Sequence, residues 1–288
     1  MDLSIIIVSY KVKEKLKENL HSIFSADRDF SLDVFVVDNN SQDGSVEMLK
    51  NDFPQVKLID NKENLGFSKA NNQALKLVHS KYVLLLNPDM RIYKDTLKNI
   101  YFWMEKNQNV SVAGIKLLNE KGEIIKHVRR FPTLLNQLAI VLKLPHIFKG
   151  ILNSYIQDNF DYNKASLVDS VRGGFFMMNL ENIRNKMNIF LDERYFIWFE
   201  EVDFCKQVRL NGGEVWYSPE AKCIDYVGQS FRQLDLRKKQ NYFKDSQLKY
   251  FKKWHSLGAY YILKLAWVLS AFMVFGAQVF HIKSKTKT

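Results

Sequence analysis

Apolar residues along the first half of the chain fall by turns into short continuous runs and into helical spacing. Such runs, when turn residues bound them, are typical of buried strands. They cover residues 3–10, 33–45 (with a polar loop at its end), 56–60, 82–86 and 110–114. The helical spacing covers residues 13–24, 68–80 and about 95–106. Strands that alternate with helices predict βαβ units, so we expect an α/β fold with a mainly parallel sheet.

The alternation loosens after residue 115. We expect a hairpin around Gly122, a strand within 168–179, and a helix over 199–213 that ends at a glycine. No internal repeat and no low-complexity linker interrupts the chain. This organisation predicts one catalytic domain, residues 1–232, followed by a helical region, residues 233–288.

Polar side chains follow three of the predicted strands. Ser9 and Tyr10 end the first strand, Asp38 and Asn39 the second, and Asn87 and Asp89 the fourth. The carboxyl ends of parallel strands meet at one edge of a sheet, where ligands bind in open α/β folds. Asp38 could accept a hydrogen bond from the ring N–H of a base, and Asp89 could hold Mg²⁺ or Mn²⁺ on a diphosphate. The alternative is that both aspartates are turn or helix-capping residues.

The segment 61–75 precedes the fourth strand. Gly66 permits a tight backbone next to a ligand or a neighbouring element. Asn64 and Asn71 have amide groups that suit a ribose, a sugar or the loop backbone, so ligand contact and loop packing both stay open. No G-x-G-x-x-G and no P-loop motif occurs in the chain, which argues against a dinucleotide enzyme or a P-loop NTPase.

Three acids, Glu200, Glu201 and Asp203, begin the helix predicted over 199–213. Acids in a first turn gain from the helix dipole, which accounts for one or two of them. Three crowded carboxylates beside apolar residues raise one another's pKa, which suits a group that must accept a proton near neutral pH. We therefore expect Glu201 to be a general base, with Asp203 or Glu200 as the next choices.

Three further residues are candidates for substrate contact. Gly173 and Gly174 lie in a strand-like segment, where small residues let a sugar approach closely or merely relieve the strand. Trp198 could stack on an acceptor sugar, although aromatic residues beside a helix are more often part of the core.

The charge balance indicates an anionic partner. The 288 residues include 42 Lys and Arg against 31 Asp and Glu, a formal net charge of +11. Nucleic acid, an acidic membrane surface or a phosphorylated substrate would each fit. The two cysteines form no disulfide framework, which indicates a reducing compartment. The N-terminal apolar run is too short for a signal peptide, so we expect the catalytic part in the cytoplasm.

The C-terminal region contains a charge-free run at 265–280, shorter than the roughly 20 residues of a spanning helix. A longer stretch, 260–282, includes Lys264, which would have to snorkel. We favour a helix that lies in the membrane surface, supported by the basic stretches 129–152 and 236–254. The alternative is a helix packed on this domain or on another subunit.

Eight motifs occur along the chain in a fixed order, from about residue 3 to about residue 232. They are IIIVSY, VVDNNSQDGS, NLGFSKANNQAL, LLLNPDMRI, RRFPT, GGFFMMN, FLDERYFIWFEEVDFC and GQSF. Together they resemble the family 2 glycosyltransferases, in the rhamnosyltransferase-like branch that builds bacterial surface polysaccharides. The resemblance implies the GT-A fold, a Rossmann-like nucleotide-sugar-binding fold with a mixed, mainly parallel sheet flanked by helices. It also implies an inverting transfer from a nucleoside diphosphate sugar, with divalent Mg²⁺ or Mn²⁺.

The resemblance also implies roles for individual residues. Asp38 matches the family's base-binding aspartate, and Asp89 matches a metal ligand of the D-x-D motif, whose first position is Asn87 here. Glu201 stands at the position of the general base, where an aspartate is more usual. Asp225 stands where a metal-ligating histidine is usual, and a carboxylate is an acceptable ligand for Mg²⁺ or Mn²⁺.

These observations predict metal-dependent, inverting transfer of a sugar to a glycan or lipid-linked glycan. We expect the reaction at the cytoplasmic face of the membrane, and the resemblance alone suggests rhamnose as the sugar. One alternative is a protein with the same fold and weak catalysis, which binds a sugar nucleotide as the partner of another protein. It is motivated by Asn87, Glu201 and Asp225, which depart from the family pattern. A nucleic-acid-binding module would explain the net charge. Acids at the strand ends would repel its phosphates, so we expect no nucleic-acid partner.

Overall fold

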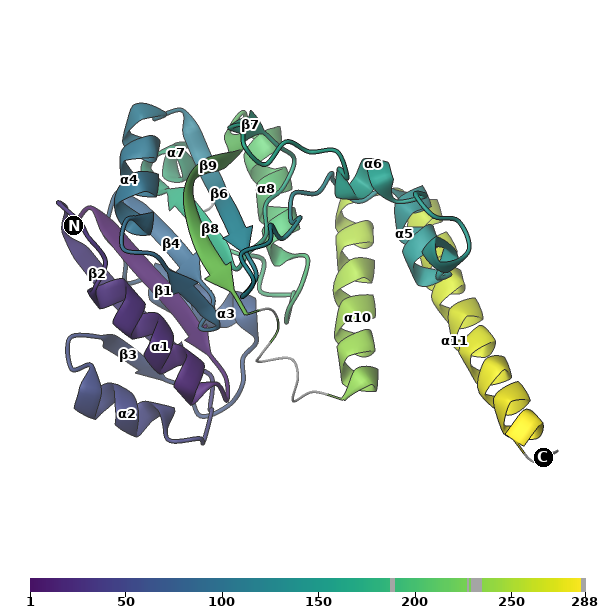
Figure 1. Ribbon diagram of the computed structural model, residues 1–288. Coiled ribbons are helices and arrows are strands. Elements are labelled where there is room, and N and C mark those ends of the chain that lie inside the picture. The colour runs from purple at the N-terminus through teal and green to yellow at the C-terminus, as the bar shows by residue number, and fades with distance from the viewer. Residues whose placement is uncertain (187–189, 227, 229–234, 286–288) are drawn as a thin grey trace.

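A nine-stranded sheet forms the centre of the computed structural model (Figure 1). The structure describes residues 1–186, 190–226, 228 and 235–285, and side chains as far as Phe272 with the exception of Lys186. The strands are β1 (Leu3–Ser9), β2 (Leu32–Asp38), β3 (Lys57–Asp60), β4 (Tyr82–Leu86), β5 (Met90–Ile92), β6 (Val110–Leu118), β7 (Ser166–Leu167), β8 (Phe175–Asn179) and β9 (Glu214–Asp225). Their order is β3-β2-β1-β4-β8-β6-β9-β5, with β7 beside β9.

Helices connect most of these strands. They are α1 (Lys13–Phe24), α2 (Ser45–Asp52), α3 (Phe67–Leu75), α4 (Thr96–Lys106), α5 (Leu134–Val141), η1 (Leu144–His146), α6 (Asn153–Ile156), α7 (Leu180–Lys186), α8 (Glu200–Leu210), α10 (Leu236–Trp254) and α11 (Leu257–Lys285). The predicted α/β class is confirmed, and so are the helices that the apolar spacing predicts in the first half. Helices α2, α5, η1, α6 and α7 were not predicted.

The parallel strands align so that their polar ends meet at one edge. β1 pairs in parallel with β2 and β4, and Ser9 lies opposite Asp38. Asp60 at the end of β3 lies opposite Asp38 in turn. The sheet is mixed, as expected, because β8 runs antiparallel to both β4 and β6. The carboxyl ends of β1, β2 and β4 therefore open on the same side, as the sequence predicts.

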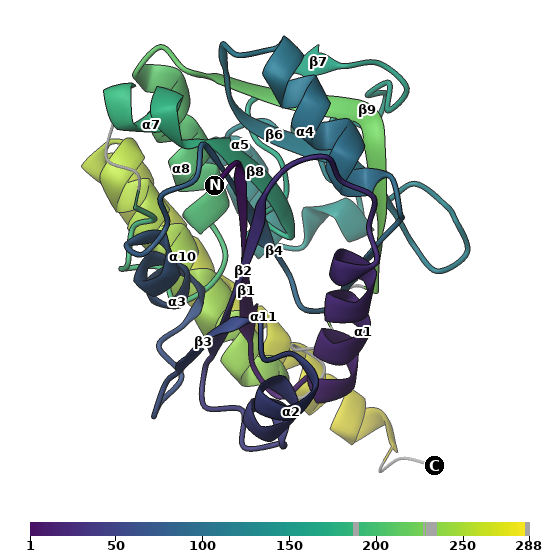
Figure 2. The same ribbon diagram turned by 90° about the vertical axis from the view of Figure 1, so that its left-hand side faces the viewer.

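Each face of the sheet is covered by helices, so the central strands are apolar on both sides. Side chains of β1 alternate between the faces: Ile5 and Ile7 pack with α1, α2 and α4, and Ile6 packs with α3, α7 and α8. Figure 2 shows the two helical layers on opposite sides of the sheet. This double cover explains why the strands appear in the sequence as continuous apolar runs.

A third apolar cluster joins the C-terminal helices to the rest of the chain. It contains Tyr250 and Phe251 of α10, Trp267 of α11 and Val141 of α5, together with Phe199 just before α8. Two buried hydrogen bonds link the three helices. Gln247 Nε2 donates to Gln137 Oε1 at 2.7 Å, and Trp267 Nε1 donates to Gln247 Oε1 at 2.7 Å. Beyond this contact α11 extends away from the sheet (Figure 1).

The finer expectations for the second half have mixed outcomes. Gly122 has φ +80° in a short hairpin in which Leu118 and Ile124 form an antiparallel bridge, as predicted. The GQSF motif falls mainly outside the described residues, and so does the expected domain boundary after residue 232. Among the helices that the structure describes, none is both long enough and apolar enough to cross a membrane.

Candidate active site

A cavity of about 570 Å³ opens at the carboxyl ends of the parallel strands. Its size is ordinary for a site that binds a small molecule. Ten of the expected site residues line it: Tyr10, Asn64, Gly66, Asn87, Asp89, Gly173, Gly174, Trp198, Glu200 and Glu201. Ser9, Asp38, Asn71, Asp203 and Asp225 lie outside this wall. The sheet thus brings residues from five separated segments of the chain to one place.

Asp38 is buried at the end of β2, beside the cavity residue Asn39. Its Oδ2 accepts a hydrogen bond from the backbone N–H of Ser41 at 2.9 Å, so the carboxylate does hold a turn. Its Oδ1 is also buried and has no hydrogen-bond partner among the described residues. Burial raises the pKa of this carboxyl, while the hydrogen bonds from Ser41 lower it. A buried acceptor of this kind suits the ring N–H of a base.

An amide network fixes the loop that precedes α3. Asn39 Nδ2 donates to Asn64 Oδ1 and to the Gly66 carbonyl, both at 3.2 Å. Asn64 Oδ1 also accepts from the Gly66 N–H at 3.0 Å. Gly66 has φ +82°, and a Cβ there would lie 2.6 Å from the Phe196 carbonyl oxygen. Asn64 therefore has a structural role in addition to its place in the cavity wall.

The Asn-Pro-Asp turn after β4 is held from three directions. Asn87 N–H donates to the Gly174 carbonyl at 2.9 Å, and Asn19 Nδ2 of α1 donates to the Met90 carbonyl at 2.6 Å. The backbone N–H of Tyr226 donates to the Asp89 carbonyl at 3.1 Å. Asp89 leads into β5 and not into a helix, which rules out the helix-capping alternative. The turn is rigid, and its three residues all face the cavity.

Asp89 and Asp225 are neighbours because β5 and β9 pair with Met90 opposite Asp225. Both residues are buried. Asp225 Oδ2 forms an ion pair with Arg172 Nη1 at 2.8 Å. No group of three or more His, Cys, Asp or Glu suited to a metal occurs within the part of the chain that the structure describes. Mg²⁺ commonly takes only one or two protein carboxylates, together with substrate phosphates and water, so the oxygen donors present fit such an ion.

Two adjacent glutamates lie at the start of α8. Glu200 is buried and Glu201 is partly exposed, and both line the cavity. In each, Oε2 is buried with no hydrogen-bond partner among the described residues. Burial raises the pKa of both carboxyls, and the charge of Glu201 raises the pKa of Glu200 further. The positive charge of Arg172 opposes the rise for Glu201, so Glu201 ionises more readily than Glu200.

The two glycines after Arg172 leave space in the cavity wall. A Cβ on Gly173 would lie 3.3 Å from the Glu201 Cβ. A Cβ on Gly174 would lie 2.5 Å from the Met90 Cε. A larger residue at Gly173 would push against Glu201, and one at Gly174 would displace the flexible end of the Met90 side chain. Both glycines also line the cavity, so they fit the packing interpretation and the substrate interpretation alike.

The hydrogen bonds of Asn71 and Asp203 indicate that both side chains have structural roles. Asn71 is buried and its Nδ2 donates to the Phe67 carbonyl within α3 at 2.9 Å. Asp203 has no exposed surface, and both of its carboxylate oxygens accept hydrogen bonds. Its donors are Tyr195, Gln207, Lys253 and Trp254.

Several cavity residues were not chosen from the sequence. Asn39, Phe196, Ile197, Lys238 and Tyr242 all line the wall. Asn39 follows Asp38 directly and could have been found from its position at a strand end. Lys238 and Tyr242 belong to α10, at least two hundred residues from that strand. No local pattern connects them to the site, because only the tertiary packing brings α10 there.

The chain is similar in sequence to known proteins. The profile of the family described as Glycosyl transferase family 2 matches residues 4–184. The low-salt glycan biosynthesis hexosyltransferase Agl10 of Haloferax volcanii is 29% identical over 213 residues, which cover 72% of this chain and 62% of Agl10. Rhamnosyltransferase WbbL of Escherichia coli is 24% identical over 232 residues, which cover 77% of this chain and 83% of WbbL.

Solved structures share the fold. Staphylococcus aureus TarS in complex with UDP-GlcNAc has a TM-score of 0.55 and 18% identity, over 95% of this chain and 73% of that one. Mannosyltransferase PcManGT of Pyrobaculum calidifontis, with GDP-Man and Mn²⁺, has a TM-score of 0.57 and 15% identity, over 96% of this chain and 75% of that one. With the GT-A fold of these structures and a family match over more than half of its length, the chain belongs to glycosyl transferase family 2.

Proposed function

We propose that the protein transfers a sugar from a nucleoside diphosphate sugar to a hydroxyl group of a glycan or lipid-linked glycan, with inversion at the anomeric carbon. The observation that carries the proposal is the cavity itself. It combines Asp89, which we assign to the donor diphosphate, with two glutamates of raised pKa, of which Glu201 feels the positive charge of Arg172. A donor site and a base in one cavity are what this reaction requires.

In the proposed reaction Glu201 is the general base. Its carboxylate takes the proton of the acceptor hydroxyl as that oxygen attacks the anomeric carbon. The bond from the anomeric carbon to the diphosphate oxygen breaks on the opposite face, and the diphosphate leaves with the bonding electrons. Glu200, whose pKa is raised well above its ordinary value, stays protonated and does not compete for that role.

Asp38 and Asp89 would hold the two ends of the nucleotide. The buried Oδ1 of Asp38 would accept from the base. Asn39, which follows Asp38, and Asn64, which Asn39 contacts, both line the cavity. Asp89 and Asp225 would hold a divalent cation. When bound, such a cation offsets the negative charge of the diphosphate. Arg172, which already pairs with Asp225, supplies a fixed positive charge at the same place.

The biological setting of the proposal draws on relatives whose names describe the biosynthesis of low-salt glycan, teichuronic acid and teichoic acid. We place the enzyme in surface polysaccharide synthesis at the cytoplasmic face of the membrane, with rhamnose as one donor sugar to test. Membrane contact is supported by the exposed apolar side chains of α11, among them Tyr261, Leu265 and Phe272.

Calorimetry with UDP, GDP and dTDP, each with Mn²⁺ and with EDTA, tests the donor site. We expect one nucleotide to bind tightly with Mn²⁺, and to bind at least about tenfold more weakly with EDTA or in Asp89→Ala. The matched control is Asp95→Ala, which removes an exposed carboxylate six residues away. Failure of all three nucleotides to bind the folded protein would overturn the proposal.

A second measurement separates an enzyme from a binding protein. UDP-GlcNAc, GDP-mannose and dTDP-rhamnose are incubated with the protein, and donor hydrolysis, in which water accepts the sugar, is followed by release of the nucleoside diphosphate. We expect release from one donor and loss of release in Glu201→Gln. Binding without release would indicate the sugar-nucleotide-binding partner protein instead.

A further inference from the structure

We propose that α10 is part of the catalytic site, because it holds the segment 192–199 in the conformation that places Glu201, with Asp203 as the central positioning residue. This inference rests on the proposed function and adds a role for a helix that lies beyond the family match, which ends at residue 184. It assigns to α10 a function in catalysis in addition to its place in the C-terminal apolar cluster.

The segment before α8 has an unfavourable backbone conformation. Trp198 and Phe199 have φ of +65° and +68°, in the left-handed region that bulky side chains rarely adopt. They directly precede Glu200 and Glu201, so their conformation sets the direction in which α8 starts. Residues in this region persist only when the surrounding structure holds them there. What surrounds this segment therefore controls where Glu201 lies.

One face of α10 provides that support. Tyr242 stacks on Phe196 with ring centroids 4.6 Å apart and an interplanar angle of 17°. One turn further, Ser246 Oγ donates to the Ile197 carbonyl at 2.7 Å. Lys249 Nζ donates to the Arg194 carbonyl at 2.6 Å another turn on. Contacts at intervals of three and four residues show that a single helical stripe follows the whole segment.

Asp203 joins this stripe to α8. Lys253 Nζ of α10 donates to Asp203 Oδ2 at 2.7 Å and to Asp192 Oδ2 at 2.9 Å. Trp254 Nε1 donates to Asp203 Oδ1 at 2.6 Å, and Tyr195 OH donates to the same oxygen at 3.2 Å. Asp203 is fully buried. One carboxylate thus connects α10, the strained segment and the helix that carries Glu201.

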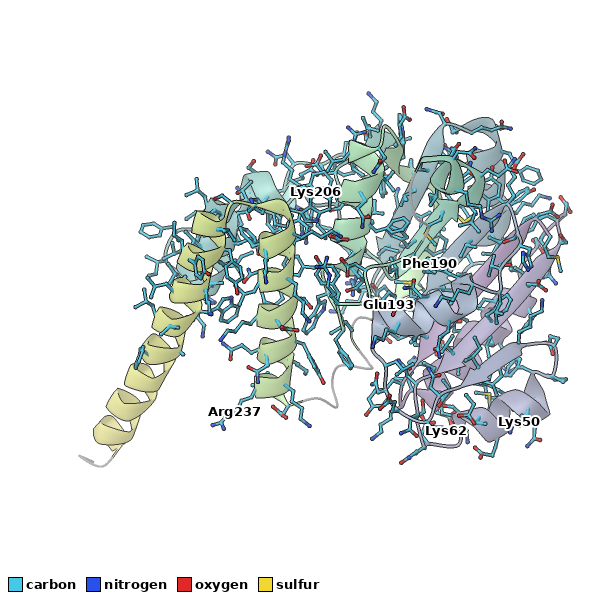
Figure 3. The ribbon with its side chains drawn as sticks, turned by 180° about the vertical axis from the view of Figure 1, so that it is seen from behind. Lys50, Lys62, Phe190, Glu193, Lys206 and Arg237 are labelled. Carbon is cyan, nitrogen blue, oxygen red and sulfur yellow. The ribbon has the colours of Figure 1, made fainter. Side chains whose placement is uncertain are left out.

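Helix α10 also contributes side chains to the cavity wall. Lys238 and Tyr242 line the cavity directly. On the opposite side of the interface, Lys206 of α8 lies 5.2 Å from the Trp254 ring and 5.3 Å from the Tyr250 ring. Figure 3 shows the labelled Lys206 between α8 and α10. Because both helices contact each other and the cavity, a displacement of α10 would move the base and the wall together.

The test compares substitutions on one helix. Lys253→Met removes the tie to Asp203, and Lys253→Arg keeps the charge there. Ser246→Ala removes the hydrogen bond to Ile197 with less effect on folding. Lys252→Met is the matched control, because Lys252 is the neighbouring lysine and is exposed. For each folded variant, calorimetry gives the Kd for UDP, GDP or dTDP. Turnover is measured as release of the nucleoside diphosphate from saturating UDP-GlcNAc, GDP-mannose or dTDP-rhamnose.

We expect Lys253→Met to lower kcat by about 100-fold and Ser246→Ala to lower it by about tenfold, because a small displacement of a catalytic group has effects of this size. The Kd for the nucleotide should not change in either variant. Lys253→Arg should recover most of the turnover. Wild-type kcat in folded Lys253→Met, or in Ser246→Ala if Lys253→Met does not fold, would overturn the inference. An equal loss in Lys252→Met would overturn it too. If the wild-type protein itself shows no release, the proposed function fails instead.

Discussion

Two neighbouring glutamates in one cavity cannot both ionise easily, because each charge opposes the other where water is scarce. Glu200 is the more buried of the two, and its pKa rises further through the charge of Glu201. Arg172 stabilises the ionised form of Glu201 only. Environments that separate the pKa values of two carboxyls divide their roles. The positive charge of Arg172 near Glu201 supports the choice of Glu201 as the base, which the resemblance to the family also implies.

Substitution of Glu201 tests that assignment. We expect Glu201→Gln to lower kcat by about 10²- to 10⁴-fold while the protein still binds nucleotide, because only proton transfer is lost. Glu201→Asp should retain part of the activity, since it keeps a carboxylate. In the wild type, activity should fall as pH drops through a pKa above the ordinary 4.5 of glutamate, because the base must be ionised. A Glu201→Gln variant with wild-type kcat would exclude this role.

His127 should make the stability of the fold depend on pH. The ring is buried and its Nε2 lies 2.8 Å from the Ile115 carbonyl oxygen. Burial lowers its pKa from 6.5 to about 3. The unfolded chain therefore binds a proton between these values that the folded chain does not, so the free energy of unfolding falls as pH drops from 6.5 towards 3.

The slope from this one group reaches about 1.4 kcal/mol per pH unit. Urea unfolding at several pH values, for the wild type and for His127→Gln, measures it. The variant should lose this part of the pH dependence, whereas His79→Gln, at an exposed position, should keep it. Equal slopes in all three proteins would contradict the interpretation.

Among the elements, the turn into α3 is the most sensitive to a single methyl group. Gly66 and Gly122 have nearly equal φ, +82° and +80°, but a Cβ on Gly122 would meet nothing within 4 Å. Gly122→Ala should therefore cost only the backbone strain, about 1 kcal/mol. Gly66→Ala adds the clash with the Phe196 carbonyl and should cost roughly 1–3 kcal/mol more. Urea unfolding of both variants measures the difference. Equal losses in the free energy of unfolding would show that the backbone at Phe196 moves aside at no cost in stability.

Strands β1 to β4, β6 and β8 were predictable because each is an apolar run with its own turn residues, whereas β5, β7 and β9 were not predicted. The register that brings Ser9 beside Asp38 follows from parallel pairing. Helix α2 has only eight residues and a polar beginning, so its apolar spacing is too short to detect. The role of Asp203 was equally hidden. An acid in a first turn has a local explanation in the helix dipole, and its actual partner Lys253 lies fifty residues away.

For the molecule as a whole, the division into a catalytic domain and a C-terminal appendage remains a prediction. The contacts argue for a closer union than the sequence suggests, because Phe199 beside the acids and Tyr250 of α10 share one apolar cluster. Apolar side chains in the described part of α11 are divided between buried and exposed positions. Leu263 and Trp267 are buried, but Tyr261, Leu265 and Phe272 are 61%, 59% and 70% exposed.

That exposed stripe should bind an acidic membrane surface. The substitutions Leu265→Ser and Phe272→Ser each remove a large apolar side chain. Burial of one such side chain in the membrane interface contributes roughly 1.5 kcal/mol to binding, so each substitution should weaken binding to vesicles by about tenfold. Co-sedimentation with vesicles of phosphatidylcholine and phosphatidylglycerol measures the change. Leu210→Ser, at the exposed end of α8, is the control. If the double variant sediments like the wild type, the stripe does not bind lipid; if it instead abolishes a dimer, the stripe serves a second copy of the chain.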